Sequence, residues 1–183
     1  MVILFGPEKT THTKGVGMLL STRARKSLLG YNPVNSRLIT ARFKATPFNI
    51  TIINVYAPTF DTSENEIEAF YDNLENAMKK IQKKDILIIT GDWNAKVDDD
   101  NTGWGSAMDR YGFGTRNERC EHLPEFATLH NLFICNTIFQ QKPNRKWTWE
   151  SPNGVHKNMI DLIIVQNAGK HLSSTVERFK ELT

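Results

Sequence analysis

The chain has 183 residues, 39% hydrophobic and 23% charged, which is enough for one domain with a sizeable core. No apolar run approaches the roughly 18–20 residues that a membrane-spanning helix needs, and no basic segment followed by an apolar one marks a secretion signal. These features argue against a membrane protein. They predict a single domain over residues 1–183, located in the nucleus or cytoplasm.

The net charge of +3 is unevenly distributed along the chain. Residues 1–60 hold eight Lys/Arg against one acidic residue, residues 61–130 hold eight against fifteen, and residues 131–183 hold seven against four. The two basic ends are consistent with a polyanionic partner, and a solvated lysine-rich surface explains the same composition.

The first part of the chain is predicted to be rich in strands. Apolar residues favour strands at 1–5 and 15–21. Residues 37–46 alternate imperfectly, and residues 48–56 are rich in β-branched side chains. Because Pro47 separates these two segments, they are predicted to form a hairpin.

A helix is predicted over residues 63–82. Ser63 and Glu66 have the spacing of a capping box at its start. Apolar residues then recur at three- and four-residue steps, which places them on one face that the protein core should cover. These residues are Ile67, Phe70, Tyr71, Leu74, Met78 and Ile81.

The run of apolar and β-branched residues from Ile86 to Thr90 predicts a buried strand that ends at Gly91. Asp92 and Asn94 follow directly, so the strand would deliver both side chains to its carboxyl end, where functional groups commonly lie. An ordinary exit from strand to turn explains these residue types equally well in isolation.

The second part of the chain begins with a polar, glycine-rich loop at 95–117. A helix is predicted from a cap at Asn117 to about Asn131, and Pro124 requires it either to begin late or to be kinked. Short strands are predicted at 132–135, 146–149 and 159–165. Together with the first part, this pattern predicts a layered α/β or α+β sandwich.

Two further strand positions carry candidate site residues. Tyr56 ends a strand shortly before Pro58, where its hydroxyl can donate to a phosphate or oxyanion, or where the ring can simply cap the core. Asp161 interrupts an otherwise apolar strand. If it is buried, the carboxylate needs a partner, and histidine is the usual one at a hydrolytic site.

An aromatic and basic segment follows residue 141. The Thr148 hydroxyl is suited to a phosphate oxygen, and Trp147 can pack in the core or stack on a base or sugar. Arg145 and Lys146 add positive charge directly before them. We therefore predict these four residues to bind substrate.

Four motifs, in this order along the chain, resemble those of the endonuclease/exonuclease/phosphatase superfamily, and within it the apurinic-type endonuclease domain of non-LTR retrotransposons. The motifs are Tyr56-Ala57-Pro58-Thr59, Gly91-Asp92-Trp93-Asn94-Ala95, Trp147-Thr148-Trp149 and Ile160-Asp161-Leu162-Ile163. Each motif is weak alone, but the ordered set is specific and covers essentially the whole chain. The resemblance implies a four-layer α/β sandwich of two mixed sheets with outer helices, and Mg²⁺-dependent hydrolysis of DNA by a monomer.

The resemblance also assigns roles to the candidate residues. Asp92 would position or deprotonate the attacking water, and Asn94 would hold Asp92 and the phosphate. Tyr56 and Thr148 would bind phosphate oxygens, and Asp161 would pair with a histidine. These roles fit a reaction in which water needs a base and the phosphorane needs donors and a cation.

The family's metal-binding glutamate and its catalytic histidine would lie outside residues 1–183, so the metal ligands are unknown and the domain is expected to be incomplete at both ends. One interpretation is an endonuclease that is impaired or inactive in this chain. The alternative is a non-catalytic remnant that binds nucleic acid or protein. A phosphatase of the same superfamily is a third possibility.

Overall fold

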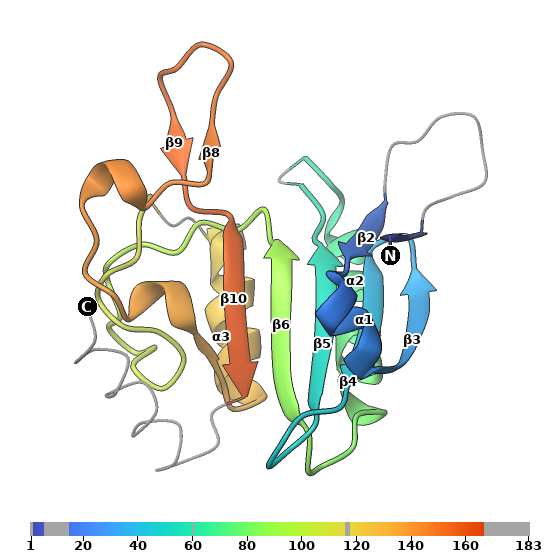
Figure 1. The fold of residues 1–183 in the computed structure, drawn as a ribbon. Coiled ribbons are helices and arrows are strands. Elements are labelled where there is room, and N and C mark those ends of the chain that lie inside the picture. The colour runs from blue at the N-terminus through green and yellow to red at the C-terminus, as the bar shows by residue number, and fades with distance from the viewer. Residues whose placement is uncertain (1, 6–14, 60, 116–117, 167–183) are drawn as a thin grey trace. The chain divides into compact units, whose positions relative to one another are not determined.

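The computed structural model describes residues 2–5, 15–59, 61–115 and 118–166 (Figure 1). The chain divides into two compact units. The first comprises Met1–Asn94 and Asp161–Ile163, and the second comprises Ala95–Ile160 and Ile164–Thr183. The prediction of a single domain over the whole chain stays a prediction.

The first unit is built mainly of strands. They are β1 (Val2–Phe5), β2 (Val16–Leu19), β3 (Leu28–Asn35), β4 (Leu38–Phe43), β5 (Ile50–Tyr56), β6 (Ile86–Asp92) and the start of β10 (Asp161–Gln166). Its helices are α1 (Thr22–Ser27) and α2 (Glu64–Lys79). β3, β4 and β5 pair antiparallel, β5 and β6 pair parallel, and β1 pairs with β2 separately. The β4–β5 pair confirms the predicted hairpin.

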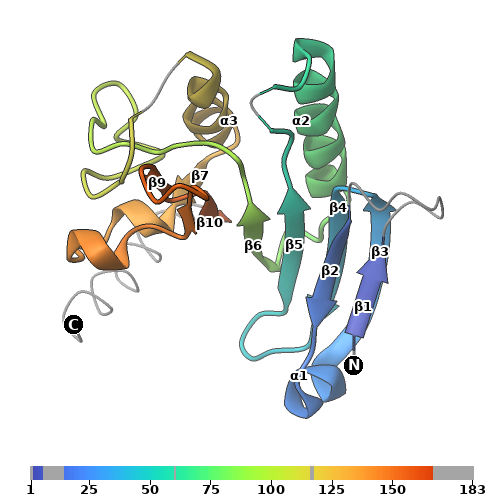
Figure 2. The same cartoon turned by 90° about the horizontal axis from the view of Figure 1, so that it is seen from above.

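The two faces of this sheet are covered by different elements, α2 on one side and β1–β2 with α1 on the other (Figure 2). Side chains alternate between the two faces of a strand, so β4 contributes to both. Ile39, Ala41 and Phe43 pack with Val16 and Leu20 on the β2 side. On α2, the buried residues are Ile67, Phe70, Leu74 and Ala77. Ile67, Phe70 and Leu74 of the predicted apolar face are therefore confirmed as core, whereas Tyr71, Met78 and Ile81 are half-buried.

The start of α2 differs from the predicted capping box. Ser63 occupies the N-cap position, but its side chain makes no capping hydrogen bond. Glu66 instead accepts a hydrogen bond of 3.0 Å from Arg37. Arg37 and Glu66 thus form a long-range ion pair at the start of the helix, which the residue spacing does not predict.

β3 is not predicted by the residue pattern, although this strand pairs with β4 along most of its length. Gly30, Asn32 and Pro33 lower its strand propensity. β3 lies at the edge of the sheet, where a proline does not interrupt a second ladder, and its register shifts at both ends.

An ion pair between a buried carboxylate and a half-buried arginine connects the loop before β6 to the hairpin. The side chain of Asp85 is 2% exposed. It accepts hydrogen bonds of 2.6 and 3.0 Å from Arg42 and one of 2.7 Å from Thr51. The hydrogen bonds from Arg42, supported by that from Thr51, hold the pKa of the Asp85 carboxyl below its usual value.

We expect Asp85→Asn to lower the free energy of unfolding by about 2 kcal/mol at pH 7. The substitution removes the negative charge that pairs with Arg42 and that accepts the hydrogen bond from Thr51. A lowered folded-state pKa means that this contribution is complete above the unfolded pKa and is lost as the pH falls through the folded one. Urea unfolding from pH 7 to pH 3 should therefore show the two proteins converging in acid. Asp72→Asn, at an exposed position of α2, is the matched control. A constant difference at all pH values would contradict the assignment.

The second unit contains short elements. They are the 3₁₀-helices η1 (Glu118–Glu121), η2 (Cys135–Thr137) and η3 (Pro143–Arg145), the helix α3 (His122–Leu129), the strands β7 (Leu132–Ile134), β8 (Trp149–Glu150) and β9 (Lys157–Asn158), and the end of β10. β7 pairs antiparallel with β10, and β8 with β9. In the first unit, β3, β4, β5, β6 and the start of β10 are neighbours in hydrogen-bonded order and combine antiparallel with parallel pairs, so the sheet is mixed, which confirms the α/β fold class.

The structure decides between the alternatives for the second helix. Pro124 is the third residue of α3, in the first helical turn, where backbone N–H groups have no intrahelical partner. The helix begins late, after η1, and Pro124 does not lie in its interior. The predicted cap at Asn117 lies outside the described residues.

The predicted strand at 146–149 is wrong. η3 occupies 143–145, and β8 begins only at Trp149. Pro143 is the first residue of η3, where its fixed φ angle favours a helical turn over an extended strand.

None of the described helices combines the length and the apolar character needed to cross a bilayer.

Candidate active site

Tyr56 and Asp92 lie side by side at the carboxyl ends of two parallel strands. They are register partners in the β5–β6 ladder, so their side chains project from the same face of the sheet. The backbone continues this contact, because the N–H of Ala57 donates a 2.8 Å hydrogen bond to the carbonyl of Asp92. The two residues come from segments 36 positions apart in sequence (56 to 92), and parallel pairing brings them together.

The turn after β6 is held by Asn94 and Trp93. Asn94 adopts a φ of 48°, a left-handed conformation that asparagine tolerates better than most residues. Its backbone N–H donates to Asp92 Oδ1 at 3.0 Å, and its Nδ2 donates to the carbonyl of Ala57 at 2.9 Å. Trp93 is 2% exposed and packs edge-on against Phe70. The buried ring anchors the turn while its two polar neighbours remain partly accessible.

Burial raises the pKa of the Asp92 carboxyl above its ordinary value. The hydrogen bond from the Asn94 N–H opposes this shift, and the negative charge of Asp161 adds to it. Asp161 therefore lies close enough to influence Asp92, at the first position of β10.

The premise that Asp161 is a buried carboxylate is wrong, because the residue is exposed. Leu162 and Ile164 are fully buried, so the strand alternates and Asp161 falls on its accessible side. The pairing of Asp161 with a histidine remains a prediction.

Arg37 supports the site and was not singled out in the sequence. Its Nη1 donates to the carbonyl of Tyr56 at 3.1 Å, and its Nη2 donates to Glu66 Oε1 at 3.0 Å. The guanidinium carbon lies 5.4 Å from the centre of the Tyr56 ring, and the side chain is only 12% exposed. Arg37 thus connects the end of β5 to α2. A lone arginine before a strand carries no local signal of this role.

The donor set at these strand ends consists of oxygen atoms. Asp92 and Asp161 are carboxylates, the negative charge of Asp161 adds to the cost of ionising the buried Asp92, and Asn94 adds an amide. Hard oxygen donors of this type match Mg²⁺, which usually takes one or two protein carboxylates and keeps several waters. Among the described residues, no group of three or more His, Cys, Asp or Glu side chains is arranged to hold a metal ion.

The predicted substrate-binding residues belong to the second unit. The Thr148 hydroxyl accepts a 3.1 Å hydrogen bond from the N–H of Ile160, and Lys157 lies 4.4 Å from the centre of the Trp147 ring. Lys146 Nζ donates to the carbonyl of Gly112 at 3.2 Å, and Arg145 is exposed at the end of η3. That these side chains join Asp92 in one site stays a prediction.

The fold is that of the endonuclease/exonuclease/phosphatase class. Residues 50–181 match the family described as endonuclease-reverse transcriptase, and the chain belongs to this family. Craniofacial development protein 2 from Bos taurus is 39% identical over 162 residues, which cover 88% of this chain and 27% of that protein. The corresponding protein of Tragulus javanicus is 37% identical over 162 residues, covering 88% of this chain and 28% of that protein. The chain therefore spans about a quarter of the length of these curated relatives.

Solved structures agree on the fold. The endonuclease domain of TRAS1, a telomere-specific non-LTR retrotransposon, matches with a TM-score of 0.58 at 18% identity, over 90% of this chain and 67% of that one. TDP2 from D. rerio, solved with a single-strand DNA product, matches with a TM-score of 0.55 at 13% identity, over 90% of this chain and 62% of that one. The resemblance in the sequence to the retrotransposon endonucleases is confirmed.

Proposed function

We propose that this chain carries the hydrolytic site of a Mg²⁺-dependent DNA endonuclease, in which Asp92, Asn94, Tyr56 and Asp161 are the catalytic residues. The observation that supports this most directly is the register of β5 and β6, which sets Tyr56 beside Asp92 at one end of the sheet. Membership of the endonuclease-reverse transcriptase family supports a phosphodiester as the substrate.

Asp92 has the properties of the base that the reaction needs. Its raised pKa moves the carboxylate toward the range in which proton transfer from water is effective. The Asn94 N–H fixes one carboxylate oxygen, and the Asn94 side chain is itself held by the Ala57 carbonyl. Asp92 therefore has a defined orientation toward the attacking water.

Tyr56 is suited to hold the scissile phosphate. A phenol hydroxyl donates to a phosphate oxygen, and the interaction strengthens as negative charge develops in the transition state. Arg37 fixes the backbone of Tyr56 and contacts its ring, so the hydroxyl is presented from a rigid strand end.

Mg²⁺ fits the oxygen donors of Asp92 and Asp161, because a cation there offsets the effects of burial and of the Asp161 charge, which raise the pKa of Asp92. When bound, it supplies Lewis-acid polarisation of the phosphate. Thr148, Trp147, Arg145 and Lys146 would hold the flanking DNA through hydroxyl, aromatic and cationic contacts.

The second candidate function is a nucleic-acid-binding module without catalysis. The observation that favours it is the group of basic and aromatic side chains in the second unit, such as Lys157 over Trp147, which needs no metal to bind a polyanion. The matched segment covers 27% of the Bos taurus relative, so other segments of that longer protein can carry further functions.

Nicking of supercoiled plasmid tests the proposal. We expect the chain to convert supercoiled to open-circular DNA only slowly in Mg²⁺, as an impaired endonuclease would, to lose this activity in excess EDTA, and to regain it when Mg²⁺ is restored, because the carboxylates need the cation. A protein that retards DNA in a gel at low salt but never nicks it would favour the binding module. Hydrolysis of a phosphomonoester without nicking would favour a phosphatase.

A further inference from the structure

The second unit contains a pocket that is lined by residues between positions 111 and 145, none of which is a proposed catalytic residue. Its volume is about 620 Å³, within the range of sites for small ligands. Besides the buried Ile138, it is lined by Tyr111, Phe139, Gln140, Gln141, Lys142 and Arg145.

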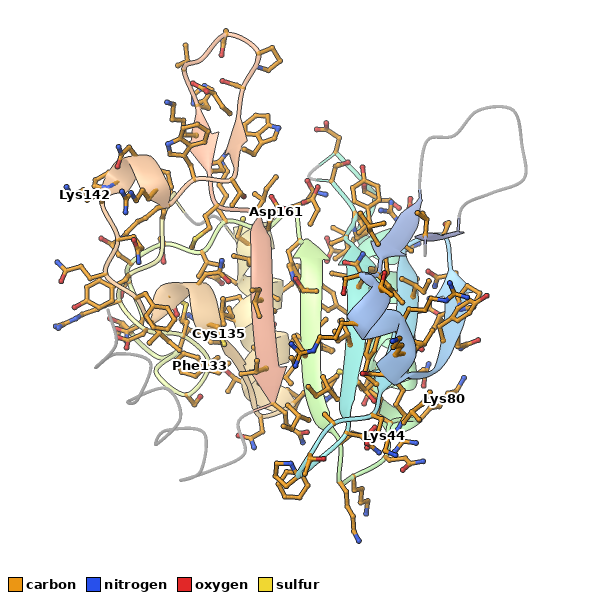
Figure 3. The ribbon with its side chains drawn as sticks, viewed as in Figure 1. Lys44, Lys80, Phe133, Cys135, Lys142 and Asp161 are labelled. Atoms are coloured by element: carbon orange, nitrogen blue, oxygen red, sulfur yellow. The ribbon has the colours of Figure 1, made fainter. Side chains whose placement is uncertain are left out.

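The lining is cationic. Lys142 and Arg145 are both exposed and stand at the two ends of η3, and no acidic residue lines the pocket. Figure 3 shows Lys142 at the outer side of this turn. Two more cations lie around Tyr111, since the guanidinium carbon of Arg110 is 5.3 Å and Lys146 Nζ is 5.9 Å from its ring centre. This distribution of charge favours an anionic ligand.

The rest of the lining selects among anions. Tyr111 and Phe139 are partly exposed aromatic rings, on which a planar base can stack. Gln140 and Gln141 are exposed amides, each of which offers a donor and an acceptor to the edge of a base. A ligand that combines a phosphate with a flat, hydrogen-bonding ring contacts the cationic, the aromatic and the amide side chains of the pocket.

We propose that this pocket binds one nucleotide of a single-stranded segment of nucleic acid, with the base against Tyr111 and Phe139 and the phosphate between Lys142 and Arg145. The proposal rests on the proposed function, since it gives the nucleic-acid substrate a second point of contact. An acidic peptide would use the cations and leave the aromatic rings and amides without a role.

Binding of a fluorescein-labelled ten-residue oligothymidylate in EDTA, measured by anisotropy, tests this assignment without any cleavage. We expect Lys142→Gln combined with Arg145→Gln to weaken binding about tenfold and to reduce the salt-dependence slope by about 0.7, which corresponds to one phosphate contact on a single strand. The control combines Lys83→Gln with Lys84→Gln, two exposed positions of the first unit with the same change in charge. It should change affinity less than twofold.

Aromatic substitutions separate base stacking from charge. Tyr111→Ala should weaken binding about tenfold, whereas Tyr111→Phe should stay within about threefold of the unchanged chain, because the ring is retained. Circular dichroism of each variant confirms that it is folded. Equal losses for the pocket and control pairs, no binding by the unchanged chain, or equally strong competition by polyglutamate would overturn the pocket.

The outcome is separable from that of the proposed function. If the oligonucleotide requires Lys142 and Arg145 while plasmid nicking is absent, the pocket stands and the endonuclease proposal fails. If plasmid is nicked and oligonucleotide binding ignores both residues, the endonuclease proposal stands and the pocket fails.

Discussion

Replacing Asp92 by asparagine is expected to abolish metal-dependent nicking and at the same time to stabilise the fold at neutral pH. The substitution removes the base and a carboxylate donor, and we expect a loss of at least about 10³-fold in rate. The amide oxygen can still accept the 3.0 Å hydrogen bond from the Asn94 N–H, so the turn should persist. Initial rates of nicking in Mg²⁺ measure the first effect.

The stabilising effect follows from the direction of the pKa shift. Burial raises the folded-state pKa of Asp92 above its ordinary value of 3.8, so the ionised carboxylate opposes folding at neutral pH. This cost is present above the folded pKa and disappears as the pH falls below the unfolded one. Asp92→Asn should therefore raise the unfolding temperature by about 2 °C at pH 7, and the gain should vanish near pH 3.5.

Asp99→Asn is the matched control, because Asp99 is exposed in the loop that follows. It should leave both nicking and unfolding temperature unchanged. Wild-type nicking by the Asp92→Asn protein would remove Asp92 from the mechanism. A lower unfolding temperature for that protein at pH 7 would show that the carboxylate is structural and is not strained by burial.

Gly91→Ala is expected to cause the largest loss of stability of any substitution near the site, about 3–5 kcal/mol. Gly91 has a φ of 140°, which side-chain-bearing residues rarely adopt, and an added Cβ would lie 2.0 Å from the backbone carbonyl oxygen of Val55. The oxygen belongs to the neighbouring strand, so relief requires β5 and β6 to separate where they present Tyr56 and Asp92. Urea unfolding and plasmid nicking should both report the damage.

Gly30→Ala provides the comparison, because a Cβ at Gly30 would meet no atom within 4 Å. Its free energy of unfolding should stay within about 0.5 kcal/mol of the unchanged chain. If Gly91→Ala were tolerated as well as Gly30→Ala, the close approach of β5 and β6 at the site would not be required for folding.

Much of the local structure could be predicted because it is encoded in neighbouring residues. The apolar spacing on α2 follows from the helical repeat, and the β4–β5 hairpin follows from two strand-forming segments around Pro47. The end of β6 was predicted to within two residues, since the apolar run stops before Gly91 and the strand continues to Asp92. In each case the signal lies within one short window of the chain.

Short elements without a strong local pattern were predicted less well. β3 carries residues that disfavour strands and is stabilised by its pairing with β4. The segment at 146–149 has strand-like tryptophans, but Pro143 starts a 3₁₀ turn and β8 is only two residues long. In these segments, pairing with a neighbouring strand, and not the propensity of the residues, decides whether a strand forms.

Tyr56, Asp92 and Asn94 could be chosen as candidates from neighbouring residues alone, because each stands at the end of a recognisable strand or in the turn after it. The folded structure was needed to show that Tyr56 and Asp92 are register partners, that Arg37 bridges Tyr56 to Glu66, and that Asp161 is exposed. These properties depend on pairing and packing between segments distant in sequence. Residue types in one window do not specify such contacts, since the folded chain alone brings their partners together.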